Sequence, residues 1–254
     1  FSPITALHGI ALIFRHALFD KGFITSQHAV IPTLVIGNIH AGGTGKTPHA
    51  SALLNIFAAR LGGAENVALL SRGYGRRSKG FKWVQEHEDW REFGDEPFLL
   101  KQLHPKHPIA VSENRLSGVA LIQRDKPHVR LVILDDGLQH RKLIPHKSIV
   151  LLDAQRPLNQ EALIPGGSLR DLKSRVTKFD AVIFTRAELS LGTGKSIFSS
   201  EMIAKMSQQS AREKSAKTRV LAVSGIAEPE RFMKDLASEW NVVRKQSYPD
   251  HYEF

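Results

Sequence analysis

Short apolar runs alternate with helical patterns along most of the chain. Runs rich in Val, Ile and Leu predict β-strands at residues 33–36, 67–70, 109–111, 131–134, 149–152, 181–184 and 220–223. Helical spacing of apolar residues predicts helices at residues 47–61, 96–103, 114–124, 196–212 and 229–239. This alternation predicts an α/β fold, in which a mainly parallel sheet is covered by helices on both faces.

The first twenty residues carry apolar side chains at helical spacing, but charged and histidine residues interrupt the pattern. A spanning helix needs about 20 nearly uncharged residues, so this segment is a poor candidate to cross a bilayer. Two interpretations fit the pattern. The helix packs its apolar face on the protein core, or it lies on a membrane surface as an interfacial anchor.

The carboxyl ends of the strands are the expected place for a ligand, because the strand-to-helix loops of a parallel sheet gather there. The polar motifs described below follow such strands. One long segment, residues 153–173, contains Pro157, Pro165, Gly166 and Gly167 and has no regular pattern. It is therefore predicted to be a hinge or an active-site loop.

The composition restricts the compartment and the partners. The chain of 254 residues contains no cysteine, which excludes disulfides, thiolate metal sites and a cysteine nucleophile and is typical of a reducing compartment such as the cytoplasm. Its formal net charge of +10 favours polyanionic partners, whether nucleic acids, anionic lipids or phosphorylated metabolites. Neither zinc-finger spacing nor an RNA-binding signature is present, so no nucleic-acid partner is expected.

A glycine-rich loop follows the first predicted strand and precedes a helix. Its sequence, GNIHAGGTGKTP, ends as a P-loop does, although His40 stands where the G-x-x-x-x-G-K-[ST] pattern has its first glycine. In such loops backbone N–H groups surround phosphate oxygens, the lysine reaches the β- and γ-phosphates and the hydroxyl binds magnesium. The loop predicts an ATP and Mg²⁺ site at His40, Ala41, Gly42, Gly43, Thr44, Gly45, Lys46 and Thr47.

Two acids end the strand predicted at residues 131–134. A carboxylate at the tip of a strand beside a P-loop holds magnesium directly or through water, so Asp135 and Asp136 are candidate metal residues. Gln139 and His140 follow at once and are candidates to orient a nucleophile or a phosphate, although an exposed turn would also explain them.

Three further motifs have both a chemical and a structural interpretation. In Gly94-Asp95-Glu96-Pro97, an acid either accepts the proton of an acceptor hydroxyl or caps the following helix. The Ser71–Arg76 segment, with Arg72, Tyr74 and Arg76, is predicted to be a mobile loop that reads phosphate. Arg170 either neutralises charge on a transferred phosphoryl group or is an exposed arginine, and the Thr185–Glu188 segment is a weak candidate to read a nucleotide base.

Taken in order, these motifs resemble the tetraacyldisaccharide 4'-kinase family, the lipid A 4'-kinases of Gram-negative bacteria. The resemblance rests on VIGNIHAGGTGKTP, LLSRGYGRR, GDEP, ILDDGLQHRKL, LIPGGSLRD, FTRAE and YPDHYEF, and it extends over the whole chain. It implies an ATP- and Mg²⁺-dependent transferase at the cytoplasmic face of the inner membrane. Such an enzyme phosphorylates the 4'-hydroxyl of an acylated glucosamine disaccharide 1-phosphate in lipopolysaccharide biosynthesis.

The resemblance also implies a role for individual residues. Lys46 and Thr47 match the phosphate-binding lysine and the magnesium ligand, Asp95 matches the proposed catalytic base and His251 its partner. Other active-site positions fall on Glu96, Gln139, His140, Arg170 and Asp171, the last of which is commonly Glu in the family.

The implied architecture is P-loop NTPase-like. Residues 1–150 are expected to form the nucleotide-binding domain with its N-terminal membrane-associated helix, and residues 151–254 a smaller α/β lobe that is incomplete at its C-terminal end. A nucleotide switch with a protein partner and a nucleic-acid-dependent ATPase remain alternatives, but neither accounts for SRGYGR or GDEP.

Overall fold

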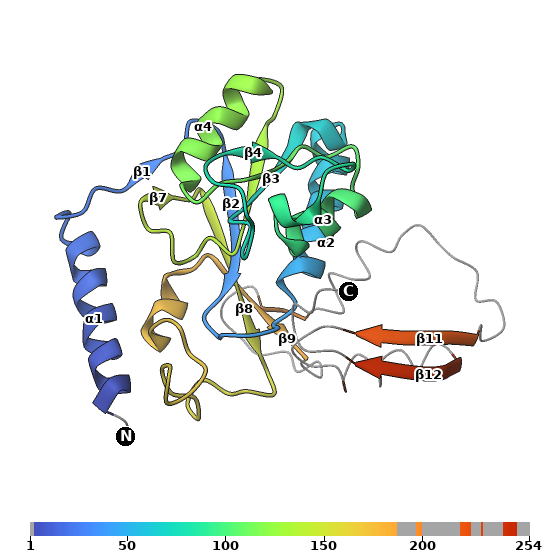
Figure 1. Cartoon of the computed structure of the whole chain (residues 1–254). Helices are drawn as coiled ribbons and strands as arrows, with labels where there is room; N and C mark the ends of the chain where they lie inside the picture. Colours follow the sequence, from blue (N-terminus) through green and yellow to red (C-terminus); the bar gives the residue numbers. More distant parts are fainter. Residues whose placement is uncertain (1–2, 187–196, 200–218, 225–229, 231–240, 248–254) are drawn as a thin grey trace. The chain divides into compact units, whose positions relative to one another are not determined.

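The structure is a computed structural model that describes residues 3–186, 197–199, 219–224, 230 and 241–247 (Figure 1). It divides into two compact units, residues 1–207 and 208–254, and each is described by itself. The sequence places a domain boundary between residues 150 and 151, but that point falls inside β8 (Lys147–Asp153). The division lies further along the chain, because β8 is hydrogen-bonded between β2 (Thr33–Asn38) and β9 (Ala181–Thr185) in one sheet.

The first unit is built on an eight-stranded sheet with the order β10-β9-β8-β2-β6-β3-β5-β4. Every neighbouring pair is parallel except β4 with β5, which confirms the predicted α/β class. The remaining strands of this sheet are β3 (Val67–Ser71), β4 (Lys82–Trp83), β5 (Ile109–Val111), β6 (Leu131–Asp135) and β10 (Ile197–Ser199).

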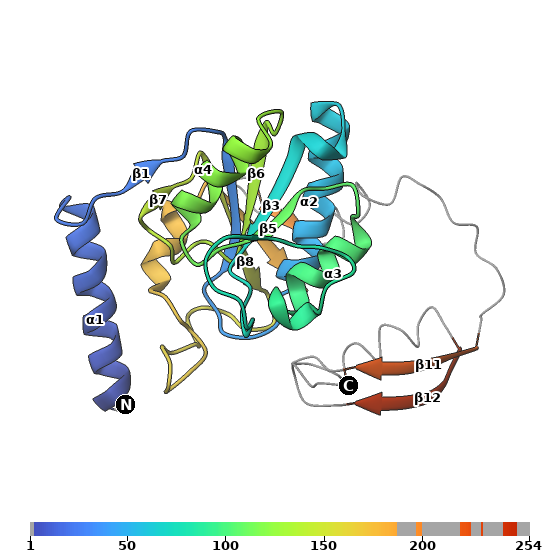
Figure 2. The same cartoon turned by 45° about the horizontal axis from the view of Figure 1, so that its top comes forward.

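Helices cover both faces of the sheet because alternate side chains of its buried strands point to opposite sides. On one face, α2 (Lys46–Leu61) and α3 (Asp95–Leu103) pack on a core that contains Ile36 and Ile133. On the other face, α4 (Arg115–Asp125) packs on a core that contains Val35 and Val132. Both views place the strands between α4 and the pair α2 and α3 (Figures 1 and 2).

The remaining elements are short or peripheral. The described residues of the first unit also form α1 (Pro3–Asp20) and a two-stranded parallel sheet of β1 (Gln27–His28) and β7 (Leu143–Ile144). Their 3-10 helices are η1 (Ala64–Asn66), η2 (Trp90–Glu92) and η3 (Lys173–Lys178). In the second unit, β11 (Arg219–Ser224) and β12 (Asn241–Ser247) form a parallel pair.

Most predicted elements are confirmed, and one is wrong. The helix predicted at residues 196–212 is contradicted at Ile197–Ser199, which forms β10 and pairs with β9 at the edge of the sheet. The apolar pair Ile197 and Phe198 fits a pleated edge as well as a helical face, so its pattern did not distinguish the two. The helix predicted at residues 229–239 lies outside the described residues except for Glu230.

Candidate active site

The glycine-rich loop leaves the carboxyl end of β2 and enters α2, as its sequence predicts. Gly45 has a left-handed backbone with φ of 78°, which lets the chain turn so that Lys46 is the first residue of the helix. Lys46 and Thr47 are half-buried at this N-terminus. The loop therefore has the backbone form that surrounds phosphate at the positive end of a helix.

Contacts from two other segments hold the loop in place. The backbone N–H of Ala41 donates to the carbonyl of Ser168 at 2.6 Å. The carbonyl of Gly43 accepts from Arg186 at 2.9 Å, and the same guanidinium donates to the buried carboxylate of Asp153 at 2.7 Å. The candidate base-reading segment thus includes Arg186, which contacts the glycine-rich loop.

His40 is buried, unlike the exposed residues that follow it in the loop. Its imidazole is fully buried, and neither ring nitrogen has a hydrogen bond of good geometry within the described residues. Burial is the main cause that lowers the pKa of His40, and the charge of Arg156 adds to it. The backbone of His40 pairs with Leu169, so this residue joins the loop to the segment that carries Arg170.

Asp135 ends β6 beside β2 and is the most perturbed acid of the site. It is fully buried, and neither carboxylate oxygen has a hydrogen-bond partner in the described part of the chain. Burial, followed by repulsion from Glu96 and Asp136, raises its pKa to about 7, while Lys46 and Arg115 act in the opposite direction. Burial of a carboxylate without a hydrogen-bond donor costs free energy. A cation bound to its oxygens would offset this cost.

Asp136 has a different environment from its neighbour. Arg170 donates to both of its carboxylate oxygens, one of them at 3.0 Å, and also to the side chain and carbonyl of Asn38. Burial opposes ionisation of Asp136, but the hydrogen bonds and charge of Arg170 prevail and hold its pKa below the usual value. Of the two acids predicted to bind metal, only Asp135 has carboxylate oxygens without a hydrogen-bond partner among the described residues. Arg170 is held at the strand ends rather than in solvent.

Gln139 and His140 follow these two acids closely in the chain. The amide of Gln139 donates to the carbonyl of Asn38 at 3.1 Å. Burial, followed by the charges of Arg115, Lys142, Arg15 and Arg72, lowers the pKa of His140 to about 4. His140 is therefore neutral at physiological pH.

Arg115 is a site residue that the sequence interpretation missed. It begins α4 after the cap Asn114, is almost fully buried and donates to the carbonyls of Ser112 at 2.6 Å and Asp135 at 3.3 Å. Burial lowers its pKa to about 10, so it is still charged at pH 7. An arginine at a helix start is usually exposed, so the sequence alone gave no signal for its burial at the site.

Two glycines bring the SRGYGR loop against the GDEP turn. A Cβ on Gly73 would lie 2.5 Å from the carbonyl oxygen of Phe93, and a Cβ on Gly94 would lie 2.8 Å from that of Tyr74. Both glycines have positive φ, 69° and 90°. The candidate substrate loop and the candidate base are thus packed backbone to backbone.

The candidate substrate residues of this loop differ in exposure. Arg72 and Tyr74 are exposed. Arg76 instead forms an ion pair with Glu113 at 2.6 Å, and its side chain is 3% exposed. Arg72 and Tyr74 are accessible to an acceptor, whereas Arg76 stabilises the loop.

Asp95 and Glu96 form the first turn of α3, as both interpretations of GDEP expect. Asp95 is half-buried, and its Oδ1 accepts the backbone N–H of Glu96 at 2.9 Å. The carboxylate of Glu96 acts on the pKa of Asp135, so this turn faces the end of β6. His251, the expected partner of Asp95, lies outside the described residues.

The donor set fits magnesium better than a metal held by protein alone. Among the described residues, no group of three His, Cys, Asp or Glu side chains is arranged to hold a metal ion. Magnesium at a nucleotide needs only one or two protein oxygens, because phosphates and waters complete its octahedron. The unpaired oxygens of Asp135 and the hydroxyl of Thr47 at the start of α2 meet that requirement.

The parallel sheet, the glycine-rich loop with its helix-initiating lysine and the strand-end acid define a P-loop phosphotransferase of the α/β class. Comparison with known proteins identifies the family. A family profile described as Tetraacyldisaccharide-1-P 4'-kinase matches residues 1–254, and the chain belongs to this family.

Individual relatives agree with this assignment. The tetraacyldisaccharide 4'-kinase of Chromobacterium violaceum is 36% identical over 100% of this chain and 76% of its own length. That of Porphyromonas gingivalis W83 is 33% identical over 99% of this chain and 75% of its own length. The crystal structure of LpxK from Aquifex aeolicus in complex with ATP matches with a TM-score of 0.79 and 30% identity, over 98% of this chain and 81% of that one.

Proposed function

We propose that this protein transfers the γ-phosphoryl group of ATP, with Mg²⁺, to the 4'-hydroxyl of tetraacyldisaccharide 1-phosphate in lipid A biosynthesis. The observation that carries the proposal is the convergence of Lys46, the unpaired Asp135 and the GDEP turn at one edge of the sheet. This arrangement provides a place for a nucleotide phosphate next to a place for an acceptor hydroxyl.

The chain holds the donor through the loop and its flanking charges. Backbone N–H groups from Gly42 to Lys46 surround the phosphates, and the ammonium of Lys46 stabilises the charge on the transferred group. Asp135 and Thr47 are the residues that would hold magnesium, whose charge would offset part of the negative charge of the phosphates. Arg170 adds a fixed positive charge at the same edge through its bonds to Asp136 and Asn38.

The acceptor approaches from the GDEP side. Asp95 lies in the turn that faces the end of β6, where its carboxylate orients the acceptor hydroxyl and takes its proton. The exposed Arg72 and Tyr74 belong to the loop that packs on this turn, so they are placed to bind the anionic sugar. We assign His251 the role of partner to Asp95 in this proton transfer.

The N-terminal helix supports a peripheral membrane partner. No helix in the described ranges is long and apolar enough to span a bilayer. The α1 helix nevertheless turns buried polar residues, Thr5 and His16, towards the protein and leaves large apolar residues more than half exposed, namely Ile4, Leu7, Ile10, Ile13 and Phe14. This inversion of the usual pattern favours an interfacial helix on the cytoplasmic face of the membrane rather than a core-packing one.

Lipid vesicles test the membrane partner separately from catalysis. Leu7→Asp and Ile10→Asp place charges on the exposed face of α1 and should reduce co-sedimentation with anionic vesicles without changing ATP affinity. Val30→Asp is a matched control, because Val30 is 70% exposed but lies outside α1. Equal vesicle binding by all of these variants and the wild type would refute the role of α1.

The acceptor class is tested by ATP turnover under three conditions. A kinase should consume ATP only when the acylated disaccharide phosphate is present. A nucleotide switch would hydrolyse ATP slowly whatever acceptor is added, and a nucleic-acid-dependent ATPase would respond to DNA or RNA. Either of the last two results would overturn the proposed function.

A further inference from the structure

The polar side of α1 is bonded to both loops that carry the strand-end residues of the site. Thr5 Oγ1 accepts the N–H of Gly166 at 3.0 Å, and the ring of His8 donates to the carbonyl of Ile164 at 3.0 Å. Further along the helix, Arg15 donates to the carbonyl of Gln139 at 2.6 Å. The helix therefore contacts the segment that precedes Arg170 and the segment that follows Asp136.

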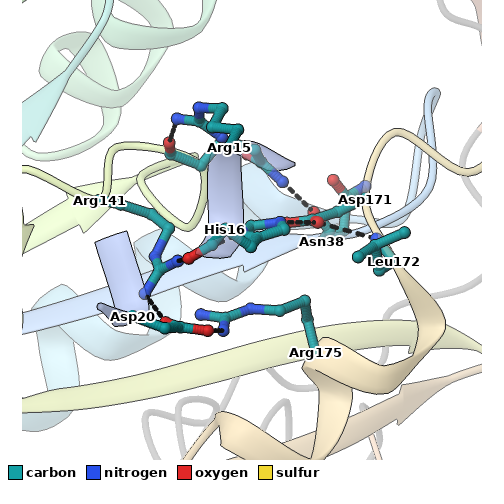
Figure 3. A network of polar contacts seen from close by, with 9 residues as sticks. Arg15, His16, Asp20, Asn38, Arg141, Asp171, Leu172 and Arg175 are labelled. Atoms are coloured by element: carbon teal, nitrogen blue, oxygen red, sulfur yellow. Dashed lines mark hydrogen bonds and ion pairs between the residues drawn. The ribbon is translucent and has the colours of Figure 1, made fainter. Parts of the chain in front are cut away.

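His16 is the most buried histidine of this helix, and its ring contacts a buried carboxylate. Its exposed fraction is 5%, and its Nε2 lies 2.7 Å from Oδ1 of Asp171, which is 2% exposed. Figure 3 shows the His16 ring directed at Asp171, with Arg141 and Asp20 on the other side. This contact joins residues 155 positions apart in the chain.

Arg141 determines which nitrogen of His16 carries the proton. Its Nη1 lies 3.1 Å from Nδ1 of His16 and 3.1 Å from the His16 carbonyl. Because a guanidinium can only donate, Nδ1 must accept, and the proton of the neutral ring is on Nε2. His16 is thus oriented to donate to Asp171, and Arg141 is itself held by Asp20 at 2.5 Å.

Asp171 transmits this contact to the site because it follows Arg170 directly. Its Oδ1 also accepts the backbone N–H of Leu172 at 2.8 Å, so the carboxylate joins His16 to the backbone just after Arg170. On the other side, the N–H of Arg170 donates to the carbonyl of Ile39 at 2.8 Å. The backbone of Arg170 is therefore held from both sides, by Ile39 just after β2 and, through Asp171, by α1.

We propose that His16 is a positioning residue for phosphoryl transfer, which acts by holding Asp171 and thereby fixing Arg170 on Asp136 and Asn38. The inference rests on the proposed function for its kinetic consequence. Without a donor at Nε2, the buried carboxylate of Asp171 loses its side-chain partner and must move towards water. The backbone of Arg170 then moves with it, and displacement of a charged group by about 1 Å is enough to slow catalysis on the order of 100-fold.

Three variants separate the hydrogen bond from the packing of the helix. His16→Phe removes the donor but keeps a ring, and we expect kcat to fall on the order of 10- to 100-fold with little change in the KM for ATP. His16→Gln places an amide donor near the position of Nε2 and should restore most of the lost kcat. His8→Phe is the matched control, since His8 lies on the same helix and contacts the same segment but not Asp171; its kcat should stay within about twofold of wild type.

A double-mutant cycle with Arg170→Ala shows whether His16 acts through Arg170. If it does, His16→Phe should have almost no further effect on kcat in the Arg170→Ala background, because the group that it positions is absent. If the double variant loses kcat by the product of the two single-variant factors, the proposal is wrong. An equal loss of kcat in His8→Phe would also overturn it.

Amide hydrogen exchange gives a readout that needs no lipid substrate. In His16→Phe, the amides of Arg170 and Leu172 should exchange faster than in the wild type, while in His16→Gln and His8→Phe they should not. Unchanged exchange in His16→Phe would overturn the positioning role even if the enzyme is active. If the wild-type protein phosphorylates no lipid but these amides still exchange faster in His16→Phe, the result supports the positioning role and contradicts only the proposed function.

Discussion

The raised pKa of the buried Asp135 carboxylate predicts how the free energy of unfolding changes with pH. Its pKa is raised from 3.8 to about 7, which corresponds to about 4 kcal/mol as an upper bound because one pKa unit is worth about 1.4 kcal/mol. The folded protein binds a proton that the unfolded chain has released between these two values. Asp135 therefore costs no stability below the lower value, and the cost grows as pH rises through the folded pKa.

Asp135→Asn removes this cost while keeping the shape of the side chain. In the absence of nucleotide and metal, the variant should be more stable than the wild type, and the difference in the free energy of unfolding should grow by about 1 to 3 kcal/mol between about pH 4.5 and about pH 8. Urea denaturation followed by tryptophan fluorescence measures this difference at each pH. Turnover should fall sharply in the same variant, because the amide has lost the negative charge.

Asp136→Asn is the matched control with the opposite sign. Arg170 holds the pKa of Asp136 low, so the wild-type pair stabilises the protein above the unfolded pKa and loses this contribution as pH falls. The control variant should therefore be less stable than wild type at neutral pH and approach it in acid. If Asp135→Asn shows the same pH trend as Asp136→Asn, the account of Asp135 as a strained, unpaired acid is wrong.

Three further variants and one control variant test the rest of the site. Lys46→Ala should raise the barrier to transfer by about 3 kcal/mol or more, since it removes a main charge on the γ-phosphate; single-turnover kinetics with near-normal rates would exclude Lys46 from the chemistry. Asp95→Ala should lower kcat but leave the Kd for ATP unchanged by calorimetry, whereas a defect in ATP binding alone would favour a capping role. Gly94→Ala should destabilise the protein and lower kcat, because its Cβ would meet the Tyr74 carbonyl at 2.8 Å. Gly75 also has a positive φ, of 70°, but a Cβ there would meet nothing within 4 Å. A thermal melt of Gly75→Ala should therefore show a smaller loss of stability, and equal losses would show that backbone strain alone matters.

Patterns local in the chain were predictable. The apolar runs gave β2, β3, β5, β6, β8 and β9 to within about two residues, because these strands are buried on both faces. The glycine-rich loop, the strand-end acids and the GDEP turn were predictable because each depends on neighbouring residues. β10 was not, since an edge strand of three residues carries too short a pattern.

Relations between distant segments were not visible in the sequence. The different environments of Asp135 and Asp136 depend on Arg170, which lies 34 residues beyond Asp136. The burial of Arg115 and the contact of His16 with Asp171 likewise exist only after the chain has folded. The pattern of α1 did not show which side faces the protein, and only the folded structure shows that Thr5 and His16 are buried while Leu7 and Ile10 are exposed.

The most direct test of the central claim is to identify the product formed from labelled ATP. The purified protein is incubated with γ-labelled ATP, Mg²⁺ and tetraacyldisaccharide 1-phosphate in mixed micelles, and the lipid is analysed by mass spectrometry and phosphorus NMR. We expect one added phosphate on the 4'-hydroxyl, present with the wild type and nearly absent with Lys46→Ala. Label released only as inorganic phosphate, at the same rate with and without the lipid, would contradict it.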